Sequence, residues 1–356
     1  MTADPKPKHI PVREEWLSQR QEAVIDPDLP IIDAHHHLWD KPGSRYLLAD
    51  IQDDISSGHN VVATVFAEGK EGYCTDGPPA LRSLGETEMV AAIAGESALV
   101  PGGPRVAAGI IGFVDMMLGE AAGPVLDAHV EAGQGRFCGI RYTTAWHGDP
   151  HARGSVTSQP AGLLYESAVR LGLREVSRRG LVFDAWMYHT QLNDLVDLAH
   201  AMPDLEIVLN HQGGPIGMGP YAGRRDEVFG DWRHWMRRLA GFANIRVKLG
   251  GFGMRMSGFD FDERPLPPSS DDLAAAWGPY MRECMETFSP RRCMFESNFP
   301  VDKGSVSYPV LWNAFKKIAG DCSPDERLDL FFRTANTTYG LELESLPGRA
   351  GTFERV

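Results

Sequence analysis

The sequence has few features that would place the protein outside the ordinary globular class. Only five of its 356 residues are cysteine, and none forms a CxxC pair, so a disulfide framework is not expected. No apolar run approaches the roughly 18 residues of a membrane span. No basic run offsets the net charge of −13, which argues against nucleic acid as a partner. Because the polar N-terminus lacks a signal peptide's apolar stretch, we expect a cytoplasmic protein.

The composition is that of a folded protein. Hydrophobic residues make up 43% of the chain and charged residues 23%. At roughly 100–200 residues per domain, the length allows two ordinary domains or one large barrel. Short runs rich in Val, Ile and Phe recur with little polar alternation, which is typical of strands buried on both faces of a parallel sheet. There are eight such runs, at residues 31–37, 61–68, 106–115, 137–145, 181–189, 206–214, 245–253 and 293–301.

Helical stretches separate most of these runs. Eight strands alternating with helices predict one α/β domain, a (β/α)8 TIM barrel. An open doubly wound sheet is the rival fold, but no GxGxxG follows the first strand. We expect an N-terminal arm over residues 1–29, the barrel over 30–343 and a C-terminal tail over 344–356. The predicted helices are residues 85–98, 161–179, 192–201, 226–239, 270–288 and 308–318.

Two long connections interrupt this rhythm, at residues 213–223 and 252–270. Loops of this length in a compact domain are usually functional, and both would emerge at the C-terminal face, where barrel enzymes carry their chemistry. The N-terminal arm carries Trp16. This side chain would pack either on a neighbouring chain, in a homo-oligomer, or across the bottom of the barrel.

The strongest local signal is the segment DAHHHLW at residues 33–39. Side chains alternate along a strand, so His35 and His37 face the same side, about 6–7 Å apart, and could share a metal ion. His189 and His211 close the fifth and sixth predicted strands. Histidines at the carboxyl ends of three strands would meet at the mouth of a barrel. The pattern predicts a site for one divalent metal, with zinc favoured.

The opening DAHHHLWD, together with GIRY, LNHQGGP, VKLGG and CMFESNFPVDK, resembles the amidohydrolase superfamily, and more narrowly the amidohydrolase-2 group. That group contains sugar-lactone, pyrone-dicarboxylate and muconolactone lactonases, with aromatic-acid decarboxylases as more distant relatives. The resemblance covers nearly all of residues 28–343 and implies a metal-dependent TIM-barrel hydrolase. It also implies that His35, His37, His189 and His211 ligate the metal, although some lactonases of the group work without one.

One position departs from the family pattern. The family usually has an Asp on the eighth strand, in a Gly-Ser-Asp-Trp-Pro context, as metal ligand or general base. The matching residue here is Asn298, an amide that forms hydrogen bonds but is no base near neutral pH. Glu296 shares its face of the strand and is our candidate for the replacement carboxylate, with Asp302 as the other choice. We expect Glu296, His211 and Asn298 to be catalytic; an ion pair of Glu296 with Lys248 is the structural alternative.

Arg141 lies on the fourth predicted strand, where two-metal members of the superfamily carry a bridging ligand. A guanidinium cannot ligate a cation, so a two-metal centre is not expected. It binds carboxylates with two prongs, and a positive mouth on an acidic protein favours a small acidic substrate. The alternative is that the cations of the mouth pair with Glu68, Asp184 or Glu296. The expected substrate-binding residues are Arg141, Tyr188, Lys248, Glu68 and Trp39.

These roles predict a hydrolase that opens a small carboxylate-bearing lactone or related ester by metal- or histidine-assisted attack of water. A metal-dependent decarboxylase of a small aromatic or unsaturated acid is the alternative on the same scaffold. A third reading is a barrel that has lost its activity and serves as a binding protein. The four histidines at the mouth argue against that third reading.

Overall fold

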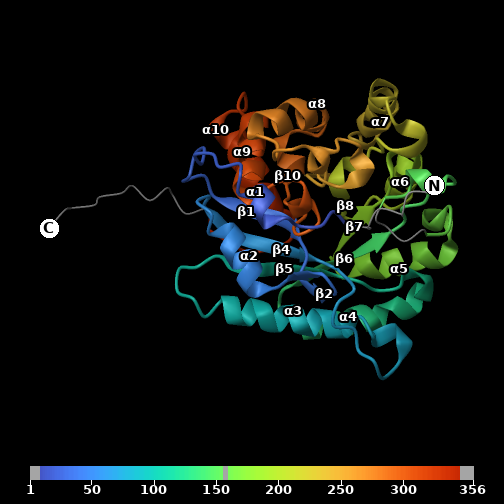
Figure 1. Ribbon diagram of the computed structural model, residues 1–356. Helices are drawn as coiled ribbons and strands as arrows, with labels where there is room; N and C mark the ends of the chain where they lie inside the picture. The colour runs from blue at the N-terminus through green and yellow to red at the C-terminus, as the bar shows by residue number, and fades with distance from the viewer. Residues whose placement is uncertain (1–8, 155–158, 345–356) are drawn as a thin grey trace.

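The computed structural model describes residues 9–154 and 159–344, which form a parallel barrel wrapped in helices (Figure 1). Its strands hydrogen-bond in the order β1-β4-β5-β6-β7-β8-β9-β10. The predicted barrel is confirmed, because each of the eight predicted runs contains one of these strands. They are β1 Ile31–His36, β4 Val61–Ala67, β5 Arg105–Gly112, β6 Phe137–Thr143, β7 Val182–Trp186, β8 Ile207–Leu209, β9 Ile245–Leu249 and β10 Cys293–Phe295.

The two ends of the sheet meet through the chain that follows β10. His37 N donates a hydrogen bond to Phe299 O at 2.7 Å, and Asn298 N donates to His35 O at 2.8 Å. An isolated parallel bridge joins His36 to Phe299 at the same place. These contacts bring the histidine-rich end of β1 beside the chain after β10, although about 260 residues separate them in sequence.

Helices enclose the barrel, with α3 beside α4 on one side and α8 beside α9 on another (Figure 1). Three have the predicted bounds: α6 Leu192–Ala201, α8 Ser270–Phe288 and α9 Tyr308–Ile318. A capping box starts α8, in which Ser269 N donates to the Asp272 carboxylate and Asp272 N to Ser269 Oγ. The other helices of the barrel are α2 Leu48–Ile55, α3 Leu84–Ser97, α4 Ala122–Ala132, α5 Ser167–Arg178, α7 Arg225–Leu239, α10 Pro324–Leu328 and α11 Thr334–Thr338.

Some elements were not predicted. Helix α4 carries Gly123 and Pro124 in its first turn, which masks it in sequence although a helix tolerates both residues there. A short antiparallel hairpin, β2 Trp39–Lys41 and β3 Ser44–Tyr46, follows β1. Strands of three residues are too short for a hydrophobic period to reveal them.

The C-terminal segment packs against the side chains that fill the interior of the barrel. Tyr339 and Leu341 form one apolar cluster with Ile32 and Ala63 from the interior faces of β1 and β4. Residues 345–356, most of the predicted tail, lie outside the described residues. Among the described helices, none has both the length and the apolar character that crossing a bilayer requires.

The N-terminal arm, described from residue 9, follows the outside of the barrel. Its short helix α1 Glu14–Leu17 places Trp16 against the loop between β9 and α8, where Trp16 Nε1 donates to Arg264 O at 3.2 Å. Further along, the Glu22 carboxylate accepts a hydrogen bond from Ser270 N at 2.8 Å. Trp16 therefore packs within its own chain near the carboxyl ends of the strands, and not across the barrel bottom, which was one of the two placements left open by the sequence.

His129 on α4 generates a prediction about acid stability. The buried ring lies 3.1 Å from Ser83 Oγ and 2.8 Å from Thr87 Oγ1. Burial lowers the pKa of His129 to about 4, so the unfolded chain binds this proton near pH 6.5 while the native chain does not. The neutral His129 therefore stabilises the native chain above pH 6.5. As the pH falls towards 4, about 3 kcal/mol of the free energy of unfolding is lost.

The variant His129→Gln should therefore lose less stability than the wild type when the pH is lowered from 7.5 to 5. Urea unfolding at both pH values measures the difference. The exposed His234 provides the matched control, because His234→Gln should keep the wild-type pH dependence. An unchanged pH dependence in His129→Gln would contradict the assignment.

Candidate active site at the mouth of the barrel

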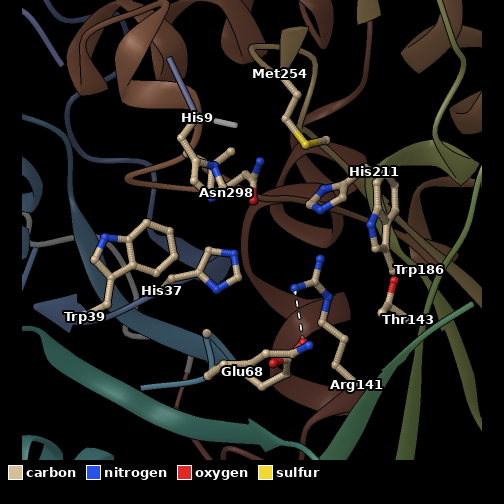
Figure 2. A pocket seen from close by; sticks show the side chains of 13 residues that line it. His9, His37, Trp39, Glu68, Arg141, Thr143, Trp186, His211, Met254 and Asn298 are labelled. Atoms are coloured by element: carbon tan, nitrogen blue, oxygen red, sulfur yellow. Dashed lines mark ion pairs between the residues drawn. The ribbon is translucent and has the colours of Figure 1, made fainter. Parts of the chain in front are cut away.

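A cavity of about 160 Å³ lies at the carboxyl ends of the strands. Figure 2 shows its wall, to which the ends of β6 and β7 and the segments following β1, β4, β8, β9 and β10 contribute. The arrangement confirms that the chemistry-bearing side chains gather at the mouth of the barrel. The lining residues are His9, His37, Trp39, Glu68, Gly69, Lys70, Arg141, Thr143, Trp186, His211, Met254, Asn298 and Val301.

His35 and His37 face each other, as their strand spacing predicted; His37 lines the cavity and His35 lies behind it. Their Nε2 atoms are 3.2 Å apart. His37 Nδ1 lies 2.9 Å from Ala67 O, and because a carbonyl only accepts, Nδ1 carries the proton and Nε2 keeps its electron pair. Burial lowers the pKa values of His35 and His37 well below the usual range, so both rings are neutral.

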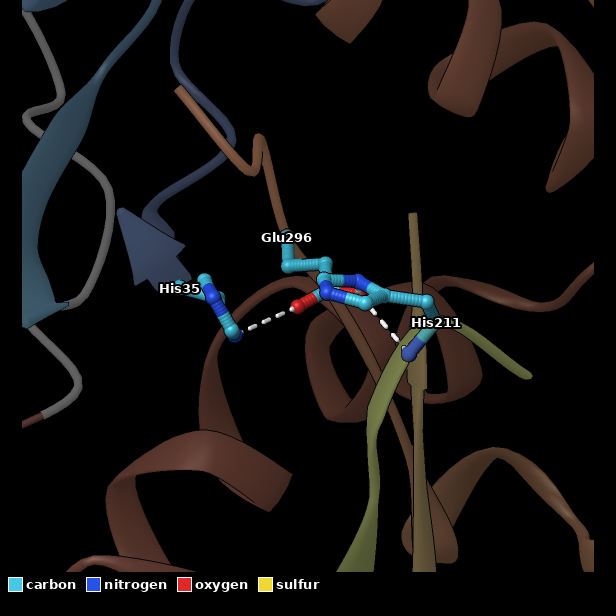
Figure 3. A group of neighbouring side chains, drawn as sticks. All are labelled: His35, His211 and Glu296. Atoms are coloured by element: carbon cyan, nitrogen blue, oxygen red, sulfur yellow. Dashed lines mark hydrogen bonds and ion pairs between the residues drawn. The ribbon is translucent and has the colours of Figure 1, made fainter. Parts of the chain in front are cut away.

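Glu296 joins His35 to His211 (Figure 3). Its Oε1 accepts from His211 Nδ1 at 2.6 Å, and its Oε2 lies 3.1 Å from His35 Nδ1. Glu296 is fully buried, and burial raises the pKa of its carboxyl to about 8. The carboxyl therefore lies beneath the cavity, where it accepts the Nδ1 hydrogen of His211 and leaves Nε2 of that ring available. The Nδ1 atom of His35 lies 3.1 Å from Glu296 Oε2 and 3.4 Å from Lys248 Nζ.

This cluster has the chemistry of a metal site. His35, His211 and Glu296 offer ligand atoms that lie within 4.8 Å of one another. Glu296 Oε2 has no hydrogen-bond partner among the described residues, so one buried lone pair remains unsatisfied. Two nitrogens on a tetrahedral zinc ion are about 3.3 Å apart, close to the 3.2 Å between the Nε2 atoms of His35 and His37. The residues present fit one divalent ion.

Two of the cavity residues have a strained backbone conformation, which the surrounding structure maintains. His211 has φ 51° and Asn298 has φ 55°, in the left-handed region that costs a residue with a side chain on the order of 1–3 kcal/mol. Gly251 explains why the neighbouring segment can approach His211 so closely, because a Cβ at Gly251 would lie 2.5 Å from His211 Nδ1. The glycine of the VKLGG motif is thus required by packing against a site histidine.

Asn298 lines the cavity at the position where the family pattern has an Asp. Its Nδ2 donates to Asp302 Oδ1 at 2.7 Å, and Asp302 Oδ2 accepts from Gly253 N at 2.8 Å. Because Nδ2 is bound to Asp302, the carbonyl oxygen of Asn298 is directed into the cavity (Figure 2). Asp302 itself is fully buried and does not line the cavity.

Arg141, Glu68 and Trp39, three of the predicted substrate-binding residues, line the cavity. Arg141 Nη1 lies 3.7 Å from Glu68 Oε1, too far for a hydrogen bond. Burial raises the pKa of Glu68, while the nearby Arg141 opposes the shift. The guanidinium of Arg141 thus faces the cavity beside the carboxyl of Glu68, without a hydrogen bond between them. This agrees in part with the alternative prediction that cations of the mouth pair with Glu68.

The structure does not bring three other predicted residues into the cavity wall. His189 lies in the turn after β7, where its Nδ1 accepts from Ile216 N at 3.3 Å, so it stands outside the metal cluster. Tyr188 is buried in an apolar cluster with Trp186. Lys248 is fully buried and pairs with Asp184 at 2.5 Å. Strand β7 ends at Trp186, before Tyr188 and His189, and β9 turns Lys248 into the barrel interior, which sequence spacing alone did not reveal.

Sequence reasoning missed other residues of the wall. His9 reaches the cavity from the N-terminal arm, and its ring centroid lies 5.6 Å from that of Trp39. Thr143 Oγ1 has no hydrogen-bond partner among the described residues. Met254 comes from the long loop after β9. The position of Thr143 at the end of a predicted strand could have indicated that it lines the cavity. His9 precedes the barrel, and nothing in the sequence around it indicates that it reaches the cavity.

Comparison with known proteins agrees with this geometry. The Amidohydrolase (Amidohydro_2) family profile matches residues 32–341. Protein y4mH of Sinorhizobium fredii, which is uncharacterised, is 31% identical over 334 residues, covering 88% of this chain and 99% of that protein.

Three solved structures show the same fold. An amidohydrolase from Burkholderia multivorans with bound zinc has a TM-score of 0.67 at 20% identity, covering 87% of this chain and 99% of that one. A candidate 2-pyrone-4,6-dicarboxylic acid hydrolase from Pseudomonas putida has a TM-score of 0.60 at 18% identity, covering 89% and 99%. The 5-carboxyvanillate decarboxylase of Novosphingobium aromaticivorans, complexed with manganese, has a TM-score of 0.56 at 13% identity, covering 88% and 97%. By its profile match and its barrel, this chain belongs to the amidohydrolase family.

Proposed function

We propose that the protein hydrolyses a small carboxylate-bearing lactone or related ester. The observation that carries the proposal is that a neutral histidine, His211, lies in the same small cavity as the guanidinium of Arg141. His211 supplies a base for water, and Arg141 supplies a two-pronged anchor for a carboxylate. A cavity of about 160 Å³ accommodates a compact substrate.

His211 and Glu296 form the proton-handling pair. The Nδ1–H group of His211 donates to Glu296 Oε1 at 2.6 Å, which leaves Nε2 free to take a proton from water. In its ionised form the buried carboxyl then stabilises the imidazolium that forms, as the carboxylate of a catalytic triad does, and its raised pKa of about 8 makes this form predominant above that pH. Glu296 thus acts through His211 rather than on water directly, because its side chain lies beneath the cavity and not in its wall.

Asn298 completes the reacting end of the cavity. Its amide is held by Asp302, so its carbonyl oxygen accepts a hydrogen bond from the attacking water and orients it. Thr143 Oγ1 offers a further hydroxyl to the substrate. These groups bind and orient, and the amide of Asn298 removes no proton.

A divalent ion would be held by His35 and His37 through Nε2, beside Glu296 and His211. When bound, it would polarise the carbonyl of the substrate as a Lewis acid. The zinc in the Burkholderia multivorans relative supports zinc as the first ion to test. The neutral state of both rings supports metal binding, since a protonated imidazole has no electron pair to offer.

The structural relatives support a small acidic substrate, because the pyrone-dicarboxylic acid of one and the carboxyvanillate of another both carry carboxylates. The decarboxylase relative keeps carboxylate loss open as a second candidate chemistry on this scaffold. Release of carbon dioxide from an aromatic acid, with no hydrolysis of any lactone, would favour it over the proposal.

Hydrolysis can be tested with 2-pyrone-4,6-dicarboxylate and with related carboxylated lactones. His211→Ala should lower kcat by at least about a hundredfold, because it removes the base, and Glu296→Gln should lower kcat by a smaller factor. Ring opening followed by absorbance gives the rates. The matched control is His200→Ala, on the outer helix α6. Wild-type turnover in His211→Ala would remove this histidine from the mechanism.

Metal content provides a separate test. Elemental analysis of the purified protein should find about one equivalent of zinc or manganese. His37→Ala should lose most of it, because the variant removes one of the two facing Nε2 atoms. His189→Ala should retain it, because that ring lies outside the cluster. Loss of metal from His189→Ala, or full occupancy in His37→Ala, would refute this assignment of ligands.

A further inference from the structure

A buried hydrogen-bond network lies under the cavity, and its centre is Asp184 on β7. The Asp184 side chain is fully buried. Its Oδ2 accepts from Lys248 Nζ at 2.5 Å and from Asn210 Nδ2 at 3.1 Å, and its Oδ1 accepts from Tyr339 OH at 3.1 Å. A buried carboxylate with donors on both oxygens is held in one orientation.

The amide of Asn210 takes its orientation from this carboxylate. Its Nδ2 donates to Asp184 Oδ2 and also lies 3.3 Å from Val208 O. Because a carboxylate and a carbonyl only accept, the NH₂ end of the amide must face them. Asn210 Oδ1 therefore points the other way, where it accepts from Arg141 Nε at 3.1 Å.

This contact decides which edge of the guanidinium is available to a ligand. Arg141 has five N–H donors in a rigid plane, and its Nε–H is already bound to Asn210. Its Nη1 lies 3.7 Å from Glu68 Oε1, beyond hydrogen-bond distance. The terminal edge formed by Nη1 and Nη2 is left to face the cavity, and the edge that includes Nε is closed.

We propose that Asn210, oriented by Asp184, is a positioning residue that presents the terminal edge of Arg141 to the carboxylate of the substrate. The inference rests on the proposed function, in which Arg141 anchors that carboxylate. Asn210 holds the anchor, and the next residue along the chain, His211, is the base. Because Asn210 and His211 are consecutive, the group that binds the carboxylate and the base that activates water are positioned by neighbouring residues. The proposed substrates are therefore compact acids whose carboxylate lies close to the reacting carbonyl.

The proposal is tested first by binding, with isophthalate as a planar dicarboxylate that cannot be hydrolysed. Calorimetry with the full chain should give a Kd that rises about tenfold in Asn210→Ala, the effect of one hydrogen bond to a charged group. Arg141→Gln should weaken binding at least as much. In the Arg141→Gln background, Asn210→Ala should have no further effect, because the two residues act as one unit.

Two further variants keep the test decisive. Arg141→Lys retains the charge but has neither the Nε–H contact nor the two-pronged edge, so its Kd should approach that of Arg141→Gln. Asn244→Ala is the matched control, since Asn244 Nδ2 also bonds two backbone carbonyls, Met202 O and Leu205 O, away from the cavity. It should bind isophthalate like the wild type and establish that losing a half-buried asparagine with two hydrogen bonds is not enough.

Failure of the inference can be told apart from failure of the proposed function. No binding of isophthalate to the wild type, wild-type binding by Asn210→Ala or Arg141→Lys, or equal losses for Asn210→Ala with and without Arg141 would each overturn the inference. If the binding results hold while no carboxylated lactone is hydrolysed, the positioning role stands and the proposed reaction falls. If kcat is measurable, Asn210→Ala should raise KM about tenfold and leave kcat within about threefold.

Discussion

The buried carboxylate of Glu296 is the constraint on which the candidate site depends. It contacts Nδ1 of both His35 and His211, which come from the first and sixth strands of the barrel. A carboxylate with no access to water is costly unless donors surround it. His211 supplies one such donor to Oε1, and this contact turns its Nε2 towards the cavity that His211 lines. The other oxygen, Oε2, lies beside His35 Nδ1 and has no hydrogen-bond partner among the described residues.

Asn298 and Glu296 lie in different layers of the site. The family pattern has its acid at the position of Asn298, in the wall of the cavity, whereas the buried carboxyl of Glu296 lies one layer deeper. Asn298 remains in the wall, held by Asp302 and by its left-handed backbone. The cations Arg141 and Lys70 line the same cavity as Asn298 and the neutral His211, which suits an anionic substrate.

Below the histidines, the barrel interior is polar where most barrels are packed with branched apolar side chains. Asp184 links Lys248, Asn210 and Tyr339, so the helix α11 region at the end of the chain reaches the floor of the site. Such a network is stable only when all members are satisfied, which makes it a rigid support. Through Asn210 the network also positions Arg141, whose distance of 3.7 Å to Glu68 is too long for a hydrogen bond.

The sequence by itself determined the barrel, its eight strands and the facing pair His35 and His37, because hydrophobic runs and the two-residue period of a strand are local properties. It also singled out Glu296 and Arg141 as inward-facing groups. It could not place His189 and Tyr188, since β7 ends at Trp186, three residues before its predicted end. It could not pair Lys248 with Asp184 either, because the two residues are 64 positions apart in sequence. The contribution of His9 and the orientation of Asn210 were decided by tertiary structure alone, because each depends on partners far away in sequence.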